Sequence, residues 1–83
     1  MRMLYFAWVR ERIGLSEEDV DPPATVKTTA ELIAWLKDRG PEYAHALAEP
    51  TAVRVAIDRV HAAGDRPLAG AREVAIFPPM TGG

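Results

Sequence analysis

The segment that decides the fold is Thr28-Thr29-Ala30-Glu31-Leu32-Ile33-Ala34-Trp35-Leu36-Lys37-Asp38-Arg39-Gly40-Pro41. Thr28, followed three residues later by Glu31, forms a capping box, which predicts that a helix begins at Thr28. Gly40 can cap the end of this helix, and Pro41 blocks its continuation. Between these signals the apolar residues recur at the spacing of one helical face, at Leu32, Ile33, Trp35 and Leu36. The segment therefore predicts one well-capped helix with a single apolar stripe.

The residues before this helix have the composition of strands. Residues 2–9 are apolar on both alternating faces, which is typical of a strand inside a sheet. Gly14 supports a turn after that strand. A weaker second strand is expected around residues 19–21, and Pro22-Pro23 ends it.

The residues after the helix return to period two. A short helical piece is expected over residues 42–48, closed by Pro50. Residues 52–57 then alternate in the manner of a half-buried strand. Residues 62–67 contain a turn or loop, and residues 73–77 form the last strand, ended by Pro78-Pro79.

The predicted order is strand, strand, helix, strand, short crossing, strand. Such an order favours an α+β fold, with a mixed sheet and one main helix packed across it. In a chain of 83 residues, a ubiquitin-like β-grasp is the natural candidate. A ferredoxin-like fold uses similar elements but needs two full helices, and residues 42–48 make a poor second one. We expect one domain over residues 1–77 and an extended, flexible tail over residues 78–83.

Composition and charge exclude several classes of function. A formal net charge of −2 argues against an electrostatic grip on nucleic acid or an anionic membrane. Arg2, Arg10 and Arg12 lie close together, but solubility and partner contact explain them better. The chain has no cysteine, so it offers no disulfide, thiolate nucleophile or cysteine metal site. The apolar N-terminus is too short to span a membrane and lacks the layout of a secretory signal, so we expect a cytoplasmic protein.

No familiar catalytic constellation appears along the chain. His45 and His61 lack the spacing of a metal pair, and we predict no metal site and no permanently bound cofactor. The acidic residues 17–19 and Asp21 are interpreted as a solvated face. No glycine-rich phosphate loop is present.

The remaining candidate is the C-terminus, Pro78-Pro79-Met80-Thr81-Gly82-Gly83. The two prolines favour extended geometry, and the two glycines form a narrow tether. Six extended residues reach roughly 20 Å, far enough to place the α-carboxylate in a partner's active site. In a chain without cysteine, the carboxyl group of Gly83 is the obvious carrier. Adenylation with ATP would activate it, and a sulfur donor could then convert it into a thiocarboxylate.

Several segments resemble a known family. They are Leu4-Tyr5-Phe6-Ala7, Val9-Arg10-Glu11 with Gly14, Val53-Arg54-Val55-Ala56-Ile57, Pro67-Leu68 and the ending Phe77-Pro78-Pro79-Met80-Thr81-Gly82-Gly83. Together they are similar to the small, sulfur-carrying subunits of molybdopterin synthase. The resemblance covers nearly the whole chain and implies a β-grasp fold.

The resemblance also implies a reaction cycle and a set of partners. A ubiquitin-activating-like adenylyltransferase would adenylate the terminal glycine with ATP, and a sulfur donor would supply the sulfur. The thiocarboxylate would then enter the large synthase subunit and donate sulfur to cyclic pyranopterin monophosphate, within a heterotetramer. The small subunit would not be catalytic alone.

The resemblance assigns roles to particular residues. Gly83 would carry the sulfur and Gly82 would permit entry of the tail. Phe6 and Phe77 match hydrophobic positions that contact a partner, although core packing explains them equally well. Arg10 matches an arginine that recurs in the family and is expected to contact a partner. The remaining expected partner-binding residues are those of the tail, Pro78, Pro79, Met80 and Thr81.

Two departures and several rival functions stay open. Asp58 stands where the family commonly has Asn, and Gly70-Ala71 places a glycine one position early, which puts turn shape in doubt. A sulfur carrier for thiazole synthesis or tRNA thiolation would share the fold and the Gly-Gly end. A ubiquitin-like protein modifier, or a plain binding module with an inert tail, is also compatible with the sequence.

Overall fold

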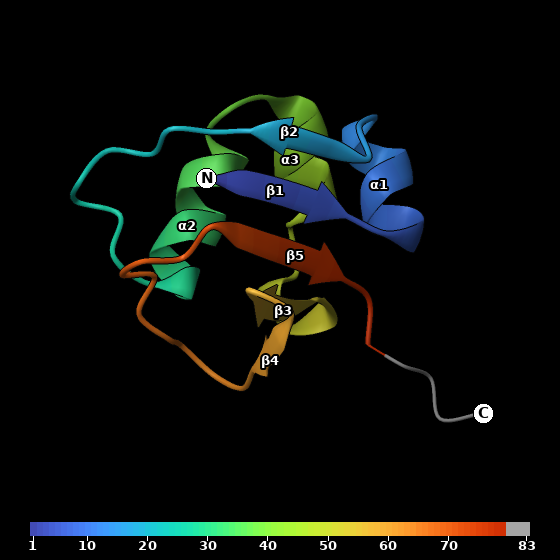
Figure 1. Cartoon of the computed structure of the whole chain (residues 1–83). Coiled ribbons are helices and arrows are strands. Elements are labelled where there is room, and N and C mark those ends of the chain that lie inside the picture. The colour runs from blue at the N-terminus through green and yellow to red at the C-terminus, as the bar shows by residue number, and fades with distance from the viewer. Residues whose placement is uncertain (80–83) are drawn as a thin grey trace.

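A computed structural model describes residues 1–79 of the chain. Within those residues, five strands form one mixed sheet in the order β2-β1-β5-β3-β4 (Figure 1). β1 runs parallel to β5, and the other neighbouring strands pair antiparallel. The strands are β1 (Arg2–Tyr5), β2 (Glu17–Asp19), β3 (Arg54–Ile57), β4 (Val60–Ala62) and β5 (Glu73–Phe77).

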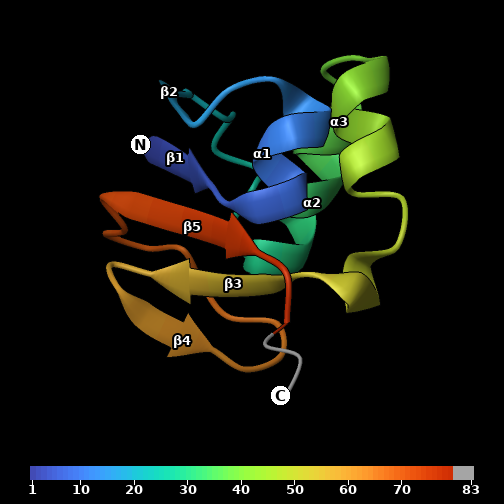
Figure 2. The same ribbon diagram turned by 90° about the vertical axis from the view of Figure 1, so that its right-hand side faces the viewer.

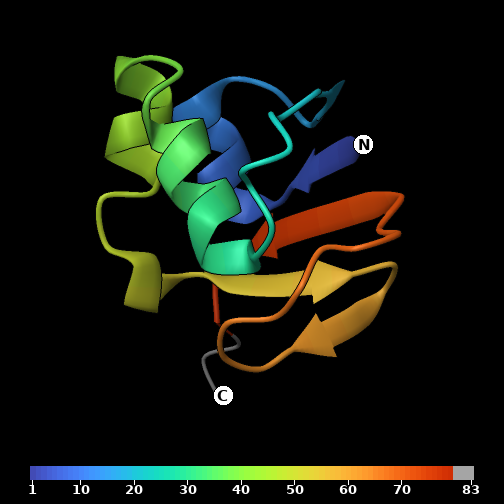
Figure 3. The same cartoon turned by 90° about the vertical axis from the view of Figure 1, so that its left-hand side faces the viewer.

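The helices gather on one side of this sheet, as the two side views show (Figures 2 and 3). They are α1 (Ala7–Ile13), α2 (Thr29–Lys37), α3 (Pro41–Ala46) and the 3-10 turn η1 (Pro50–Ala52). α3 contacts both α1 and α2. A mixed sheet of this order with helices on one face confirms the α+β, β-grasp prediction.

Alternation along the strands places the core between sheet and helices. The residues of β1 and β5 that point toward the helices are buried, as is Val55 of β3, whereas Ile57 is only partly buried. α2 contributes the inner half of its apolar stripe. The side chains that are almost fully excluded from solvent are Met3, Tyr5, Val9, Leu32, Leu36, Leu47, Val74 and Ile76. Ile33 and Trp35, the outer members of the stripe, are only partly buried.

The prediction of a strand over residues 2–9 is wrong after Tyr5. The chain turns at Phe6, which is the N-cap of α1, and Ala7 has a φ of 53°, which extended backbone cannot adopt. The spacing of Val9 and Ile13, both buried, is helical. Gly14 ends the helix with a φ of 91° and donates its N–H to the carbonyl of Arg10 (2.8 Å).

The N-terminus of α2 is capped as predicted, with one addition. The hydroxyl of Thr28 accepts the N–H of Glu31 (3.3 Å), and the Glu31 carboxylate accepts the N–H of Lys27 (3.0 Å). The third cap comes from outside the helix, because Asp65 accepts the N–H of Ala30 (2.9 Å). That hydrogen bond holds the pKa of the Asp65 carboxyl below its ordinary value.

The end of α2 differs from the prediction. α2 ends at Lys37 with Asp38 as its C-cap, and Gly40 is not a left-handed cap. Its φ of 164° is extended, and it precedes α3 as the N-cap. Pro41 therefore begins the next helix, since the first helical position needs no N–H donor.

The predicted strand over residues 52–57 is shorter in the structure, where β3 begins at Arg54, and the turn or loop predicted within residues 62–67 is present. At the start of the predicted strand, Ala52 belongs to η1. At its end, Ile57 leads through Asp58 and Arg59 into β4. These two residues have φ values of 48° and 72° and form a two-residue hairpin of type I′ geometry. The loop begins only after Ala62.

The two departures from the family pattern are accommodated. The Asp58 carboxylate accepts the N–H groups of Arg72 and Glu73 (3.0 Å each), which ties the β3–β4 hairpin to the start of β5. Gly70 lies at the position of positive φ (77°), and Ala71 does not. The early glycine thus stands where the turn needs it.

Candidate functional site

One face of the sheet carries an apolar surface that no helix within residues 1–79 covers (Figure 1). Strand register places its members side by side, because Leu4 pairs with Ala75, Ala75 with Ala56, and Ala56 with His61. Paired residues share a face, and Phe77 lies two residues beyond Ala75 on the same side. We call this surface the open face and define it by Leu4, Ala56, His61, Ala75 and Phe77.

Phe6 and Phe77 lie at the same end of the central strands. The N–H of Phe6 donates to the carbonyl of Ile76 (3.2 Å). Phe6 therefore lies beside the end of β5, where the chain leaves the sheet and the tail begins. Phe6 is 46% exposed, whereas Phe77 is half-buried. The exposure excludes core packing as the role of Phe6 and supports a contact surface.

The predicted tail lies partly outside the described residues. Pro78 and Pro79 follow directly from β5 and are half-buried. Met80, Thr81, Gly82 and Gly83 lie outside the residues that the structure describes. The described root of the tail therefore leaves the sheet beside Phe77.

The His61 ring extends the open face onto the outer strand β4. It packs against Phe77 with ring centroids 6.3 Å apart and planes tilted by 53°. From the sequence, His61 is noted only as a histidine without the spacing of a metal pair. Register could have indicated its position, because residues 54 and 56 already alternate toward the open face.

Charged side chains surround this surface. Arg2 pairs with Glu17 (3.7 Å) and Arg59 with Glu73 (3.9 Å). Each pair includes a side chain that is more than half exposed, so each contributes little to stability. Arg54 donates to the carbonyls of Thr51 and Val53.

Arg10 lies on α1, one helical turn after Phe6. Its backbone N–H donates to the carbonyl of Phe6 (3.4 Å), and the residue is exposed. The structure therefore brings Arg10 close to Phe6 along the chain but not onto the open face. The neighbouring Arg12 stacks over the Trp8 ring at 4.5 Å.

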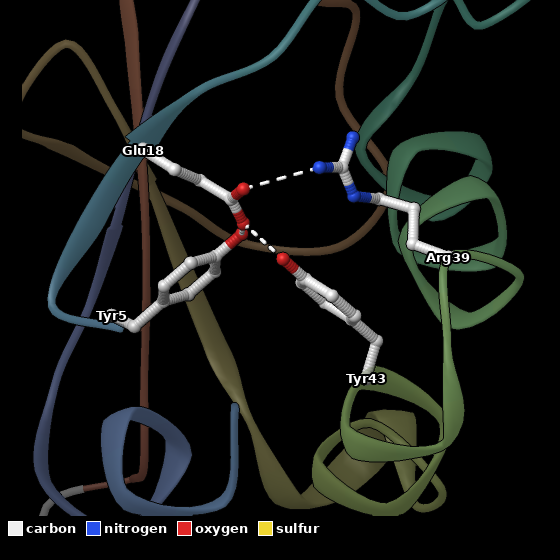
Figure 4. Close-up of polar contacts among 4 residues, drawn as sticks. All are labelled: Tyr5, Glu18, Arg39 and Tyr43. Atoms are coloured by element: carbon white, nitrogen blue, oxygen red, sulfur yellow. Dashed lines mark hydrogen bonds and ion pairs between the residues drawn. The ribbon is translucent and has the colours of Figure 1, made fainter. Parts of the chain in front are cut away.

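The acidic run at residues 17–19 is not a uniform solvated face. Glu17 and Asp19 are exposed, but Glu18 points inward and joins three side chains (Figure 4). Its carboxylate accepts hydrogen bonds from the hydroxyls of Tyr5 (2.8 Å) and Tyr43 (2.6 Å), and Arg39 pairs with it at 3.1 Å.

This cluster is structural in character. Burial, and then the hydrogen bond to Glu18, raise the pKa of the Tyr5 hydroxyl and, in the same order, that of Tyr43. Both phenols therefore stay protonated and serve as donors. The cluster joins β2 to the helical layer on the side opposite to the open face.

Neither metal-binding nor membrane-spanning features appear in the described part of the chain. Within residues 1–79, no three His, Asp or Glu side chains gather as metal ligands would. None of the helices there is long and apolar enough to cross a bilayer.

Comparison with known proteins adds the family. A model of the ThiS family matches residues 3–83, which is nearly the whole chain. The chain belongs to the ThiS family. It is also similar to the "Molybdopterin synthase sulfur carrier subunit" of Escherichia coli (strain K12). The two are 38% identical over 85 aligned positions, which cover 100% of this chain and 99% of that protein.

In this ThiS-family chain, the candidate site thus has two parts. The first is the C-terminal segment that begins at Pro78. The second is the open face together with Phe6, which lies at the root of that segment. The sequence predicted Phe6, Phe77 and the prolines, and it missed Leu4 and His61, which only strand pairing brings beside them.

Proposed function

We propose that this chain is the sulfur-carrier subunit of a molybdopterin synthase. The observation that carries the proposal is the full-length similarity, 38% identity, to the Escherichia coli subunit of that name. The chain also ends in Gly82-Gly83 and lacks cysteine, so its α-carboxylate is the natural attachment point for sulfur.

The proposed chemistry takes place at the Gly83 carboxylate. A ubiquitin-activating-like adenylyltransferase uses ATP to form the acyl adenylate and releases pyrophosphate. A sulfur donor then forms a bond to the acyl carbon as the bond to AMP breaks, which leaves a thiocarboxylate. The thiocarboxylate gives its sulfur to cyclic pyranopterin monophosphate inside the large synthase subunit, and water restores the carboxylate.

The proposed role of the open face is docking. A surface of Leu4, Ala75 and Phe77 beside the exposed Phe6 is apolar at its centre and charged at its rim, which is the layout of a protein interface. Docking there would fix the root of the tail, and the residues beyond Pro79 could then enter the large subunit. Arg10 and the tail residues Met80, Thr81 and Gly82 are proposed contacts along the same path.

Intact mass spectrometry tests the carrier step. Incubation with ATP, the adenylyltransferase and a sulfide source should add the mass of one oxygen-to-sulfur exchange. A chain that lacks Gly82 and Gly83 is the matched control and should gain nothing. An unchanged mass in the full-length chain would rule out the carrier function.

A second assay identifies the pathway. The thiocarboxylated chain, the large synthase subunit and cyclic pyranopterin monophosphate should together yield molybdopterin. Sulfur transfer only to a thiazole precursor or to tRNA would assign the carrier to another pathway. Conjugates linked to lysine side chains would instead indicate a protein modifier.

A further inference from the structure

The open face contains one side chain that can change its charge near neutral pH, that of His61. Strand register places His61 opposite Ala56, and its ring packs against Phe77 with centroids 6.3 Å apart. Histidine is the residue type whose charge ordinarily changes between about pH 5 and 8. The other members of the open face are all apolar, namely Leu4, Ala56, Ala75 and Phe77. The protonation of His61 therefore decides whether this apolar surface carries a positive charge.

The His61 ring is open to solvent in the free chain. The residue is exposed, and within residues 1–79 no ion pair joins its ring to a carboxylate. A charge on the ring therefore costs little while the face is uncovered. A partner that covers the face removes the ring from water, and burial without a partner of opposite charge disfavours the charged form.

The charged groups around His61 on the sheet are of both signs. Arg54 of β3 shares the open face with His61, because each lies an even number of positions from the paired residues 56 and 61. In the turn after β3, the Asp58 carboxylate already accepts two backbone N–H groups. Arg59 of the same turn pairs with Glu73 of β5 (3.9 Å). Two cations and two carboxylates thus oppose one another, and neither sign prevails.

The helix side of β4 adds a second mixed set of charges. His61 borders a groove of about 710 Å³ between α2 and the β3–β4 hairpin. The Lys37 ammonium and the carboxylates of Asp38 and Asp65 also line this groove. The Asp65 carboxylate is already engaged with α2, where it accepts the N–H of Ala30 (2.9 Å). Removal of the His61 ring from water is therefore the effect that decides which form of the ring a docked partner selects.

We propose that His61 makes docking of the open face depend on pH, with the neutral imidazole as the form that binds. The inference rests on the proposed function, because it takes the large synthase subunit as the partner of this face. The apparent affinity then falls with the fraction of chains in which the ring is neutral. An ordinary histidine titrates at about pH 6.5, so this fraction is about one-tenth at about pH 5.5. Docking at mildly acidic pH also releases a proton, because coupling between two binding equilibria is reciprocal.

Isothermal titration calorimetry against the large subunit tests the pH dependence. For the wild-type chain, Kd should be about tenfold higher at about pH 5.5 than at about pH 8. His61→Leu keeps an apolar side chain that cannot be protonated, so its Kd should lack this tenfold rise. His45→Leu is the matched control and should keep the wild-type dependence, because His45 is exposed on α3, away from the open face.

The proton released on docking gives an independent readout. Titrations at about pH 6 in two buffers of different ionisation enthalpy measure the number of protons released. The wild-type chain should release a fraction of a proton more than His61→Leu does. A role of His61 in packing alone would change the affinity but leave the number of released protons the same in the two chains.

The outcomes separate this inference from the proposed function. If the wild-type chain does not bind the large subunit at any pH, the proposed function itself is wrong. If wild type and His61→Leu bind with the same pH dependence and the same proton release, the proposed function stands and the inference about His61 is wrong. Circular dichroism checks that each variant folds. His61→Gln, which is also uncharged, takes the place of His61→Leu if the leucine variant does not fold.

Discussion

The backbone N–H of Phe6 donates to the carbonyl oxygen of Ile76 across 3.2 Å, where β1 has just ended and β5 has one residue left. Through this hydrogen bond, the turn into α1 is joined to the strand that leads into the C-terminal tail. The backbone of Phe6, which carries an exposed ring, is therefore held beside the end of β5.

This relationship predicts a loss of partner binding without a loss of fold. Phe6→Ala should weaken binding to the large synthase subunit by about tenfold or more, as truncation of an aromatic anchor does. The unfolding free energy should change little, because the ring is 46% exposed. Isothermal titration calorimetry and urea unfolding measure the two effects.

The control for this prediction is His45→Ala. His45 is exposed on α3, in the helical layer and away from the open face. Its loss should leave binding unchanged. Equal effects of both substitutions would show that Phe6 makes no specific contact with the large subunit.

A second prediction concerns the cluster around Glu18. Glu18→Ala should lower the unfolding free energy by about 1–3 kcal/mol, since it leaves the hydroxyl of Tyr5, only 1% exposed, without its acceptor. Urea denaturation measures this change. Glu17→Ala removes an exposed neighbour and should stay within about 0.5 kcal/mol of wild type. Similar values for the two variants would mean that the cluster adds no stability.

Alkaline pH should destabilise the fold through Tyr5. Burial and Glu18 raise its pKa in the folded protein above the value of about 10 found in unfolded chains. The folded state therefore holds a proton that the unfolded state loses. This contribution to stability is fully present below pH of about 10 and is lost as pH rises toward the folded-state pKa.

Urea midpoints measured at a series of alkaline pH values test this dependence. Tyr5→Phe should make the fall with pH shallower, because the titrating group is gone. An unchanged slope in that variant would assign the alkaline transition to other groups.

The turn between β3 and β4 offers a stabilising substitution. Arg59 has a φ of 72°, a region in which residues other than glycine are strained, and its ion pair with Glu73 is long and exposed. Arg59→Gly should raise the unfolding free energy by about 0.5–1 kcal/mol. The substitution removes the strain of the left-handed backbone, but glycine loses more conformational freedom on folding, which offsets part of the gain.

Gly70→Ala is the converse control. Gly70 has a φ of 77°, and a Cβ there would meet no atom within 4 Å, so only backbone strain would act. The variant should lose about 1–2 kcal/mol. Thermal or urea unfolding compares the two, and a loss of stability in Arg59→Gly would contradict the prediction.

The sequence predicted some elements better than others. The capping box of Thr28 and Glu31 placed the start of α2, and alternation placed β5 correctly at residues 73–77. Residues 7–9 were misassigned because Ala7, Trp8 and Val9 form a continuous apolar run, which fits the spacing of a strand as well as that of a helix. The buried pair Val9 and Ile13 and the cap at Gly14 were the signals that could have identified α1.

What the sequence by itself determined was the family and the capped helix, and it supplied the end of the chain that we propose as the sulfur carrier. These features depend on local residue order. Thr28 stands three residues before its capping partner Glu31, and Gly82-Gly83 follow the two prolines Pro78 and Pro79 closely. Tertiary structure alone decided which residues share a surface. Parallel pairing of β1 with β5 brought Leu4 beside Ala75, and the inward turn of Glu18 brought it to Tyr5 and Tyr43. Such contacts join positions far apart in the chain, and their free energy arises only when the sheet and helices pack together.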